Sequence, residues 1–175
     1  MGQVKTERLL QLLIGVCLGV LVYAIADSFE QKIVEAGDAA PDFTITTDNG
    51  RTISRSEFGG KLLVLNFWAT WCPPCIQEMP SLDQFQRAFA GSGVVVLGVS
   101  VDRNPQAYRA LVQKTKVAFL TARDPEARIS ADYGTFKYPE TYIIDRSGKV
   151  VQKIIGPTNW TDDKMVNQIK ALLSL

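Results

Sequence analysis

Two cysteines near the middle of the chain have the spacing of a redox dithiol. Cys72 and Cys75 are separated by Pro73 and Pro74 and follow the apolar run 62–65. At the first turn of a helix, unpaired N–H groups and the helix dipole stabilise a thiolate, so we expect a lowered pKa for Cys72. Cys72 would then attack a target disulfide, and Cys75 would resolve the mixed disulfide. The two prolines set the geometry of the turn, because neither has an N–H to donate.

Two other roles are open to a C-x-x-C pair. A structural disulfide that closes so short a loop would stabilise the fold only slightly. A metal site would need more donors, and the chain has no histidine and only one further cysteine, Cys17, so two chains would have to share an ion. The absence of histidine also excludes Ser-His-Asp and Cys-His catalysis and leaves carboxyl, thiol, Lys and Tyr groups for proton transfer.

The composition limits the partners. The 175 residues are 46% hydrophobic and carry 19 basic and 18 acidic side chains. This is typical of one globular domain with an appendage. A nearly neutral chain argues against a nucleic acid as partner, since phosphate binding requires a basic face. No cofactor is predicted.

The N-terminal segment predicts a single membrane anchor. Residues 9–26 contain one strongly polar side chain, Gln11, and a helix over this range is about 27 Å long, close to the thickness of the bilayer core. Basic residues in 1–8 and mostly acidic ones after the run predict a cytoplasmic N-terminus. A signal sequence cleaved after Ala26 is the alternative, because residues 24–26 have the A-x-A pattern. Either outcome exports the rest of the chain.

Beyond a polar tether at 27–37, residues 38–175 show alternating strand and helix patterns. They predict one α/β domain with a central mixed sheet between helices. Asp124 and Thr161 are the expected caps of the last two helices. The expected strands are 40–46 and 51–53, which form a hairpin, then 61–69, 94–101, 119–121, 141–145 and 149–155; the expected helices are 73–89, 105–116, 125–133 and 161–173.

The segment around the dithiol resembles a known family. Residues 66–75 and 78–80, with the blocks 40–43 and 138–145, resemble the membrane-anchored thioredoxin-like proteins of the TlpA, ResA and cytochrome c maturation type. The resemblance implies a thioredoxin fold with an N-terminal β-hairpin and an inserted β-α unit. It also implies a domain on the periplasmic side of the bacterial cytoplasmic membrane. That domain would reduce disulfides of exported proteins, apocytochrome c among them, and a membrane electron donor would recharge it.

The resemblance also assigns residues around the dithiol. Pro139 matches the cis-proline that lies beside the cysteines in this family. It would leave the main chain of Tyr138 free to pair with an extended substrate. Trp71 would cover the disulfide and, with Pro73 and Pro74, contribute to the substrate-binding surface.

Two glutamates receive roles from the same resemblance. Glu78 matches a carboxyl that tunes the cysteine pair, and burial would raise its pKa so that it could relay the proton of Cys75. Asn66 stands where cytoplasmic thioredoxins carry a buried aspartate, which gives more weight to Glu78. Glu140 resembles a substrate-facing acidic residue of the cytochrome-maturation members. For each glutamate, the alternative is a solvent-exposed side chain without a catalytic role.

Two further functions compete with disulfide reduction. A peroxide reductase on the same fold would resemble a P-x-x-x-T-x-x-C pattern, but here Thr70 is only two residues before Cys72 and the proline is missing. A non-enzymatic metal or haem carrier is the other alternative. Copper proteins of related shape use a distal histidine, which this chain lacks.

Overall fold

The computed structural model describes residues 2–28 and 33–174, and the chain divides into two compact units after residue 32. The first unit is helix α1 (Gly2–Ser28), which contains the predicted anchor 9–26 and extends beyond it at both ends. Among the residues that the structure describes, no helix is both long enough and apolar enough to cross a membrane. Residues 29–32 of the predicted tether lie outside the described residues.

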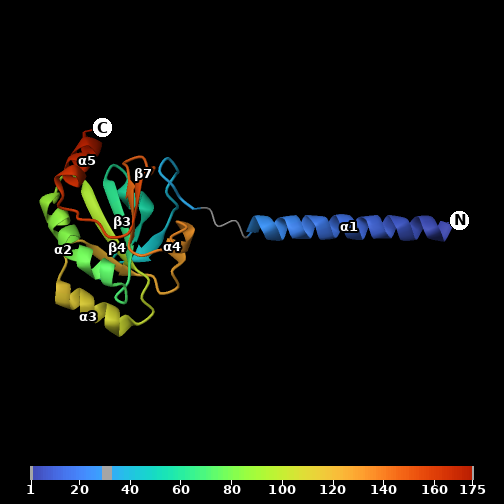
Figure 1. The fold of residues 1–175 in the computed structure, drawn as a ribbon, viewed down its shortest axis with the longest axis horizontal. Coiled ribbons are helices and arrows are strands. Elements are labelled where there is room, and N and C mark those ends of the chain that lie inside the picture. The colour runs from blue at the N-terminus through green and yellow to red at the C-terminus, as the bar shows by residue number, and fades with distance from the viewer. Residues whose placement is uncertain (1, 29–32, 175) are drawn as a thin grey trace. The chain divides into compact units, whose positions relative to one another are not determined.

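The second unit is built on a five-stranded mixed sheet (Figure 1). Its strand order is β5-β4-β3-β6-β7, in which β3, β4 and β5 are parallel and β6 and β7 are antiparallel to their neighbours. The central strand β3 is buried along its whole length, as its continuous apolar run predicts. The strands are β3 (Leu62–Trp68), β4 (Val94–Ser100), β5 (Leu120–Arg123), β6 (Glu140–Ile144) and β7 (Val150–Ile155).

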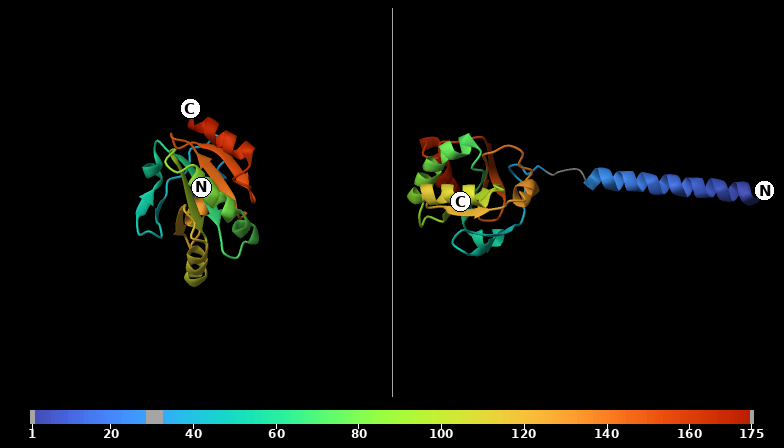
Figure 2. Two further views of the ribbon diagram at one scale, coloured as in Figure 1. Left: turned by 90° about the vertical axis from the view of Figure 1, so that its left-hand side faces the viewer. Right: turned by 90° about the horizontal axis from the view of Figure 1, so that it is seen from below.

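Alternate side chains of β3 face two different layers. Leu62 and Val64 pack with Leu82 of α2, whereas Leu63 and Leu65 pack with the hairpin and α4. The layers appear on opposite sides of the sheet, and the hairpin is seen beside it in cyan (Figures 1 and 2). One layer contains α2 (Pro73–Ala88), α3 (Pro105–Thr115) and α5 (Asp163–Leu173); the other contains β1 (Thr44–Thr46), β2 (Thr52–Ser54), the 3₁₀ turn η1 (Arg55–Phe58) and α4 (Arg128–Asp132).

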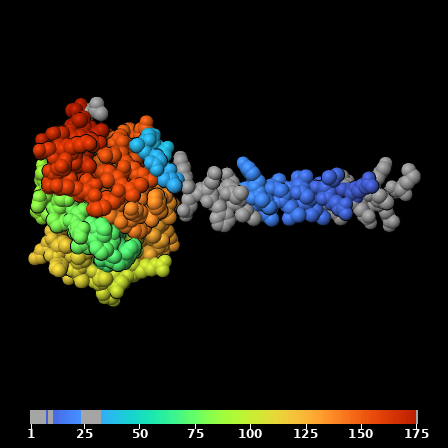
Figure 3. Space-filling view, viewed as in Figure 1, coloured from blue at the N-terminus to red at the C-terminus, as the bar shows by residue number. Residues whose placement is uncertain are grey.

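Helices α2 and α5 share one face because their apolar side chains meet above the sheet. Phe85 of α2 contacts Trp160, just before α5, with ring centroids 5.4 Å apart, and Ile169 of α5 joins the same core. The surface view shows the red C-terminal segment directly beside the green segment that includes α2 (Figure 3). The architecture is the predicted α/β sandwich with an N-terminal hairpin, and β5 supplies the strand of the inserted unit.

Most predicted ends are displaced by one or two residues, and three differences are larger or concern a helix cap. The first strand is limited to β1, not 40–46. The third helix of the globular unit begins at Arg128 rather than 125, because Ala127 adopts a left-handed backbone conformation and interrupts the turn after Asp124. The Asp124 carboxylate still accepts the N–H of Ile129 at 2.8 Å. The last helix is capped by Asp162 instead of Thr161.

The globular unit also includes part of the predicted tether. Val34 is buried, and its N–H donates to the carbonyl of Tyr133 at 3.2 Å. The side chain of Glu35 reaches Lys153, with 3.0 Å between Oε1 and Nζ. Packing therefore extends back to the first described residues after the gap.

The sheet register brings two distant segments to one end of the molecule. β3 ends at Trp68, four residues before Cys72, and its Phe67 pairs with Glu140 at the start of β6. Because β6 runs antiparallel to β3, the segment that precedes Glu140 lies at the end of the sheet where the dithiol turn begins. Tyr138 and Pro139 are thus placed beside the cysteines.

Candidate active site

The two cysteines occupy the first turn of α2. Cys72 is the N-cap residue, and Pro73 and Pro74 fill the first helical positions, where an N–H would be unpaired in any case. The structure joins Cys72 and Cys75 by a disulfide with 5.3 Å between their Cα atoms. The N–H of Cys75 points at the sulfur of Cys72 at 3.3 Å. This donor and the helix dipole would stabilise a Cys72 thiolate once the disulfide is reduced.

The cysteines differ in access to solvent. Cys72 exposes 5% of its surface and Cys75 exposes 1%. Both pack in a small cluster with Trp68, Met79 and Val101. In this oxidised state the difference is small, but it has the direction that an attacking Cys72 and a sequestered Cys75 require.

A cis-proline and two aromatic rings surround the disulfide. The Tyr138–Pro139 peptide bond is cis, and Tyr138 packs against the cysteine cluster. Trp71 is 63% exposed, and its ring lies edge-on to Tyr138 with centroids 5.9 Å apart. The carbonyl of Pro139 accepts the N–H of Gly156 at 2.8 Å, whereas the main-chain N–H and carbonyl of Tyr138 make no hydrogen bond within the described residues. An extended polypeptide could therefore pair with Tyr138.

Glu78 lies on the same side of α2 as Cys75 and is buried. Its Oε1 accepts the side-chain amide of Asn66 at 2.8 Å, and its Oε2 accepts the main-chain N–H of Thr158 at 2.9 Å. Burial raises the pKa of Glu78 to about 6, although these two hydrogen bonds favour the ionised form and limit the rise. Glu78 is therefore not the solvent-exposed side chain that was the alternative for this residue. A carboxyl with this pKa can accept and return a proton near neutral pH.

Sequence reasoning missed the partners of Glu78. The sequence shows only that Asn66 replaces the aspartate of cytoplasmic thioredoxins. In the structure its amide donates to Glu78 and to Thr141 Oγ1, the latter at 2.9 Å, and so links β3, α2 and β6. Asn66 lies on the same face of β3 as Val64 and Trp68, because every second residue of a strand faces the same side, and this period could have placed it on the side of α2. The Thr158 N–H carries no sequence signal, because any residue except proline supplies one.

The structure places Glu140 away from the predicted substrate-facing position. Its side chain is 0% exposed and lies on the opposite face of the sheet from Glu78. Glu140 Oε1 accepts the hydroxyl of Tyr142 at 2.5 Å and lies 3.4 Å from Lys153 Nζ. Its Oε2 has no partner within the described residues. The physical reason is the register of β6, which turns the residue after Pro139 inward.

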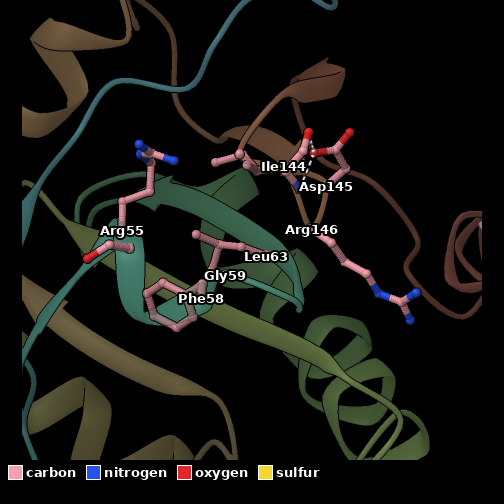
Figure 4. A pocket seen from close by; sticks show the side chains of 10 residues that line it. Arg55, Phe58, Gly59, Leu63, Ile144, Asp145 and Arg146 are labelled. Carbon is pink, nitrogen blue, oxygen red and sulfur yellow. Dashed lines mark hydrogen bonds between the residues drawn. The ribbon is translucent and has the colours of Figure 1, made fainter.

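A small pocket at the other end of the sheet takes no part in this site. It lies where Leu63 of β3 pairs with Ile144, far from the end that carries the cysteines. Its two arginine side chains extend in different directions (Figure 4). Arg55 is paired with Asp42, and Arg146 donates to a main-chain carbonyl of α5. The charged groups therefore do not converge on a ligand.

A helix-capping dithiol faced by a cis-proline on the adjoining strand is the arrangement of the thioredoxin-fold oxidoreductases. In this class the cysteine pair, as a dithiol or a disulfide, exchanges with a disulfide or a dithiol of another molecule. Comparison with known proteins specifies the family. The profile of the AhpC/TSA family matches residues 36–153.

Relatives and solved structures agree with this class. The chain is 34% identical to thiol-disulfide oxidoreductase ResA of Bacillus cereus over 83% of both proteins. It is 38% identical to the thioredoxin-like protein YneN of Bacillus subtilis, over 69% of this chain and 71% of that one. A crystal structure from Chlorobium tepidum, described as a thiol:disulfide interchange protein DsbE, matches with a TM-score of 0.74 and 31% identity, over 80% of this chain and 99% of that one. The chain belongs to the AhpC/TSA family and, within it, to the TlpA/ResA group of thiol-disulfide oxidoreductases.

The Glu140–Lys153 pair generates a stability prediction. Lys153→Met would leave the buried Glu140 carboxylate without its cation, so we expect the free energy of unfolding to fall by about 3–5 kcal/mol. Chemical denaturation measures this loss. Lys149→Met, which changes an exposed lysine directly before β7, should change the free energy of unfolding by less than about 0.5 kcal/mol. Adding Glu140→Gln to Lys153→Met should recover most of the loss; an equal or larger loss in the double variant would contradict the pairing.

The raised pKa of Glu78 predicts a dependence of stability on pH. Folded Glu78 keeps its proton up to about pH 6, whereas an unfolded glutamate releases it near 4.5. The folded state therefore binds more protons in this window, and stability falls as pH rises through it, by about 2 kcal/mol in total. We subtract the free energy of unfolding of the Glu78→Gln variant from that of the oxidised protein. We expect this difference to fall by about 2 kcal/mol from pH 4 to pH 7. A difference that stays constant would show an ordinary carboxyl.

Proposed function

We propose that this oxidoreductase is a membrane-tethered reductase of disulfides in exported proteins. The observation that carries the proposal is the disulfide at the start of α2, which lies beside the unpaired main chain of Tyr138 and the exposed ring of Trp71. An extended segment of a target protein can lie along Tyr138 as an added strand. Its disulfide would then be held against the sulfur of Cys72, the more exposed of the two cysteines.

The exchange begins with the reduced enzyme. The Cys72 thiolate attacks one sulfur of the target disulfide, forms a mixed disulfide and releases the other target sulfur as a thiolate. Cys75 then loses its proton and attacks Cys72, which forms the Cys72–Cys75 disulfide and releases the second target thiolate. The target gains two electrons and, after both thiolates are protonated, two protons. The enzyme loses the same two electrons and becomes the oxidised form described above.

Glu78 is proposed as the proton acceptor for Cys75. Both residues lie on one side of α2 and are buried, so solvent has little access to the Cys75 thiol. A carboxyl with a pKa of about 6 is ionised at neutral pH and can take the proton, then return it to a departing thiolate. Asn66 and Thr158 would hold the carboxylate in place during this transfer.

Residues 9–26 are proposed to cross the bacterial cytoplasmic membrane once, with 1–8 in the cytoplasm and the globular unit outside. The support is the apolar sequence of the segment and the basic residues before it. Large apolar side chains between Leu12 and Tyr23 are exposed on α1, and an apolar surface of this extent marks contact with lipid or protein. Cleavage after Ala26 remains the alternative.

The substrates and the electron donor follow from the same proposal. An extracytoplasmic compartment is oxidising, so a reductase there must receive electrons from elsewhere. A membrane dithiol protein is the proposed donor: its two thiols reduce the Cys72–Cys75 disulfide and become a disulfide in turn. Apocytochrome c is one proposed substrate, on the strength of the sequence resemblance.

Peroxide reduction is the function that the same fold could otherwise carry. The threonine of a peroxide-reducing site acts beside the reactive cysteine. Here the Thr70 hydroxyl instead donates to Asp102 at 2.6 Å, and the proline of that pattern is absent from the sequence. Both observations favour disulfide exchange. The metal or haem carrier alternative remains a prediction that no contact in the described residues favours.

Trapping of mixed disulfides tests the roles of the cysteines and the location together. In cells, Cys75→Ala should accumulate mixed disulfides through Cys72, because the resolving thiol is missing. Cys72→Ser should accumulate none. Affinity purification and mass spectrometry of the captured proteins should identify exported proteins with cysteine pairs. Accumulation in Cys72→Ser instead would reverse the two roles, and capture of cytoplasmic proteins alone would contradict the proposed location.

The direction of electron flow has a separate test. A reductase should have a reduction potential near that of thioredoxin, about −270 mV, rather than near that of the oxidant DsbA, about −120 mV. Equilibration of the full chain with glutathione or dithiothreitol buffers measures this value. A potential close to −120 mV would contradict reduction while leaving disulfide exchange itself intact.

A further inference from the structure

The turn that carries Cys72 is fastened to the end of β4 by a buried carboxylate. Asp102 lies two residues beyond Ser100, the last residue of β4, and exposes 1% of its surface. Its Oδ2 accepts the main-chain N–H of Thr70 at 2.8 Å and the hydroxyl of Ser100 at 2.6 Å. Its Oδ1 accepts the hydroxyl of Thr70 at 2.6 Å. One side chain thus takes both hydrogen-bond donors of the residue that stands two positions before the reactive cysteine.

The turn has few other restraints. Between the end of β3 and the start of α2, the N–H of Cys72 donates to the carbonyl of Ala69 at 3.2 Å. The turn borders an open groove that is lined by Thr70, Trp71, Asp102 and Arg103 and by residues at the start of α3. The groove is open to solvent, so the contact with Asp102 is the side-chain hydrogen bond that restrains Thr70 within the described residues.

We propose that Asp102 is a positioning residue for disulfide exchange, which acts through Thr70 to keep the Cys72 sulfur at the N-terminus of α2. The stabilisation of a thiolate by helix N–H groups is confined to the first turn. The 3.3 Å contact from the Cys75 N–H to Cys72 depends on where the preceding turn ends. When the disulfide opens, the covalent restraint on Cys72 is lost. The Asp102–Thr70 contact then holds the turn together with the Cys72–Ala69 hydrogen bond and the packing of Trp71 against Tyr138.

Two effects of Asp102 on Cys72 have opposite signs, which makes the proposal testable. A nearby negative charge disfavours a second negative charge, so the field of Asp102 alone would raise the pKa of Cys72. Positioning at the helix terminus lowers the pKa of Cys72. Removing Asp102 therefore lowers the Cys72 pKa if the charge dominates and raises it if positioning dominates.

The test uses the full chain with Cys17→Ala and Cys75→Ala, so that Cys72 is the only thiol. Its ionisation is followed by thiolate absorbance between pH 4 and 10, and its rate with a small disulfide is measured at pH 7. We expect Asp102→Asn and Thr70→Val each to raise the Cys72 pKa and to slow the reaction by about threefold to tenfold. Thr70→Ser, which keeps the hydroxyl, should restore both values.

Thr121→Val is the matched control. The Thr121 hydroxyl also donates to an aspartate at 2.6 Å, but that aspartate is Asp48 in the hairpin turn. This variant removes a comparable hydrogen bond from the same domain, so it should leave the Cys72 pKa unchanged. If Asp102→Asn does not fold, the comparison of Thr70→Val with Thr70→Ser and Thr121→Val decides alone. A lowered or unchanged pKa in Thr70→Val, or an equal rise in Thr121→Val, would overturn the proposal.

Discussion

The chemistry of this protein depends on the contact between the Cys72 sulfur and the N-terminus of α2. The N–H of Cys75 and the positive end of the helix dipole create a site that favours a thiolate. The rest of the globular unit aligns other groups with this point. β3 leads the chain to the turn, β6 returns beside it with the cis peptide before Pro139, and the end of β4 holds the turn through Asp102.

Two buried glutamates show how environment divides one residue type into two roles. The hydrogen bonds to Glu78 come from neutral donors, an amide and a main-chain N–H, so burial raises its pKa into the range useful for proton transfer. Glu140 lies on the opposite face of the sheet and is paired with the ammonium group of Lys153. We assign this buried ion pair a structural role rather than a role in proton transfer. The glutamate with the raised pKa is thus the one on the α2 side of the sheet, where the dithiol also lies.

Local patterns predicted most of the elements. Strands β3 and β4, with their continuous apolar runs, and helices α2 and α3, which begin at prolines, lie close to their predicted ranges. The N-terminal hairpin is present, with a shorter first strand than predicted. Errors occurred where competing local signals were nearly equal. Thr161 and Asp162 are both good cap residues, and the side chain of Asp162 proved to accept the N–H of Lys164. Asp124 accepts an N–H of α4 as predicted, but α4 begins three residues later than predicted because Ala127 has a left-handed backbone conformation.

The sequence alone determined the reactive group and its place at a helix start, because these depend on neighbours within a few residues. It also determined the resemblance to one family, because each matching block is a short run that is recognised without knowledge of the contacts between blocks. Only the tertiary structure decided which distant groups meet it. The sheet register turned Glu140 inward and brought Tyr138 beside Trp71. The same packing joined Asn66 to Glu78 and Asp102 to Thr70. Such contacts join residues 12 to 75 positions apart in the chain, and no local pattern specifies which side chains the sheet will align.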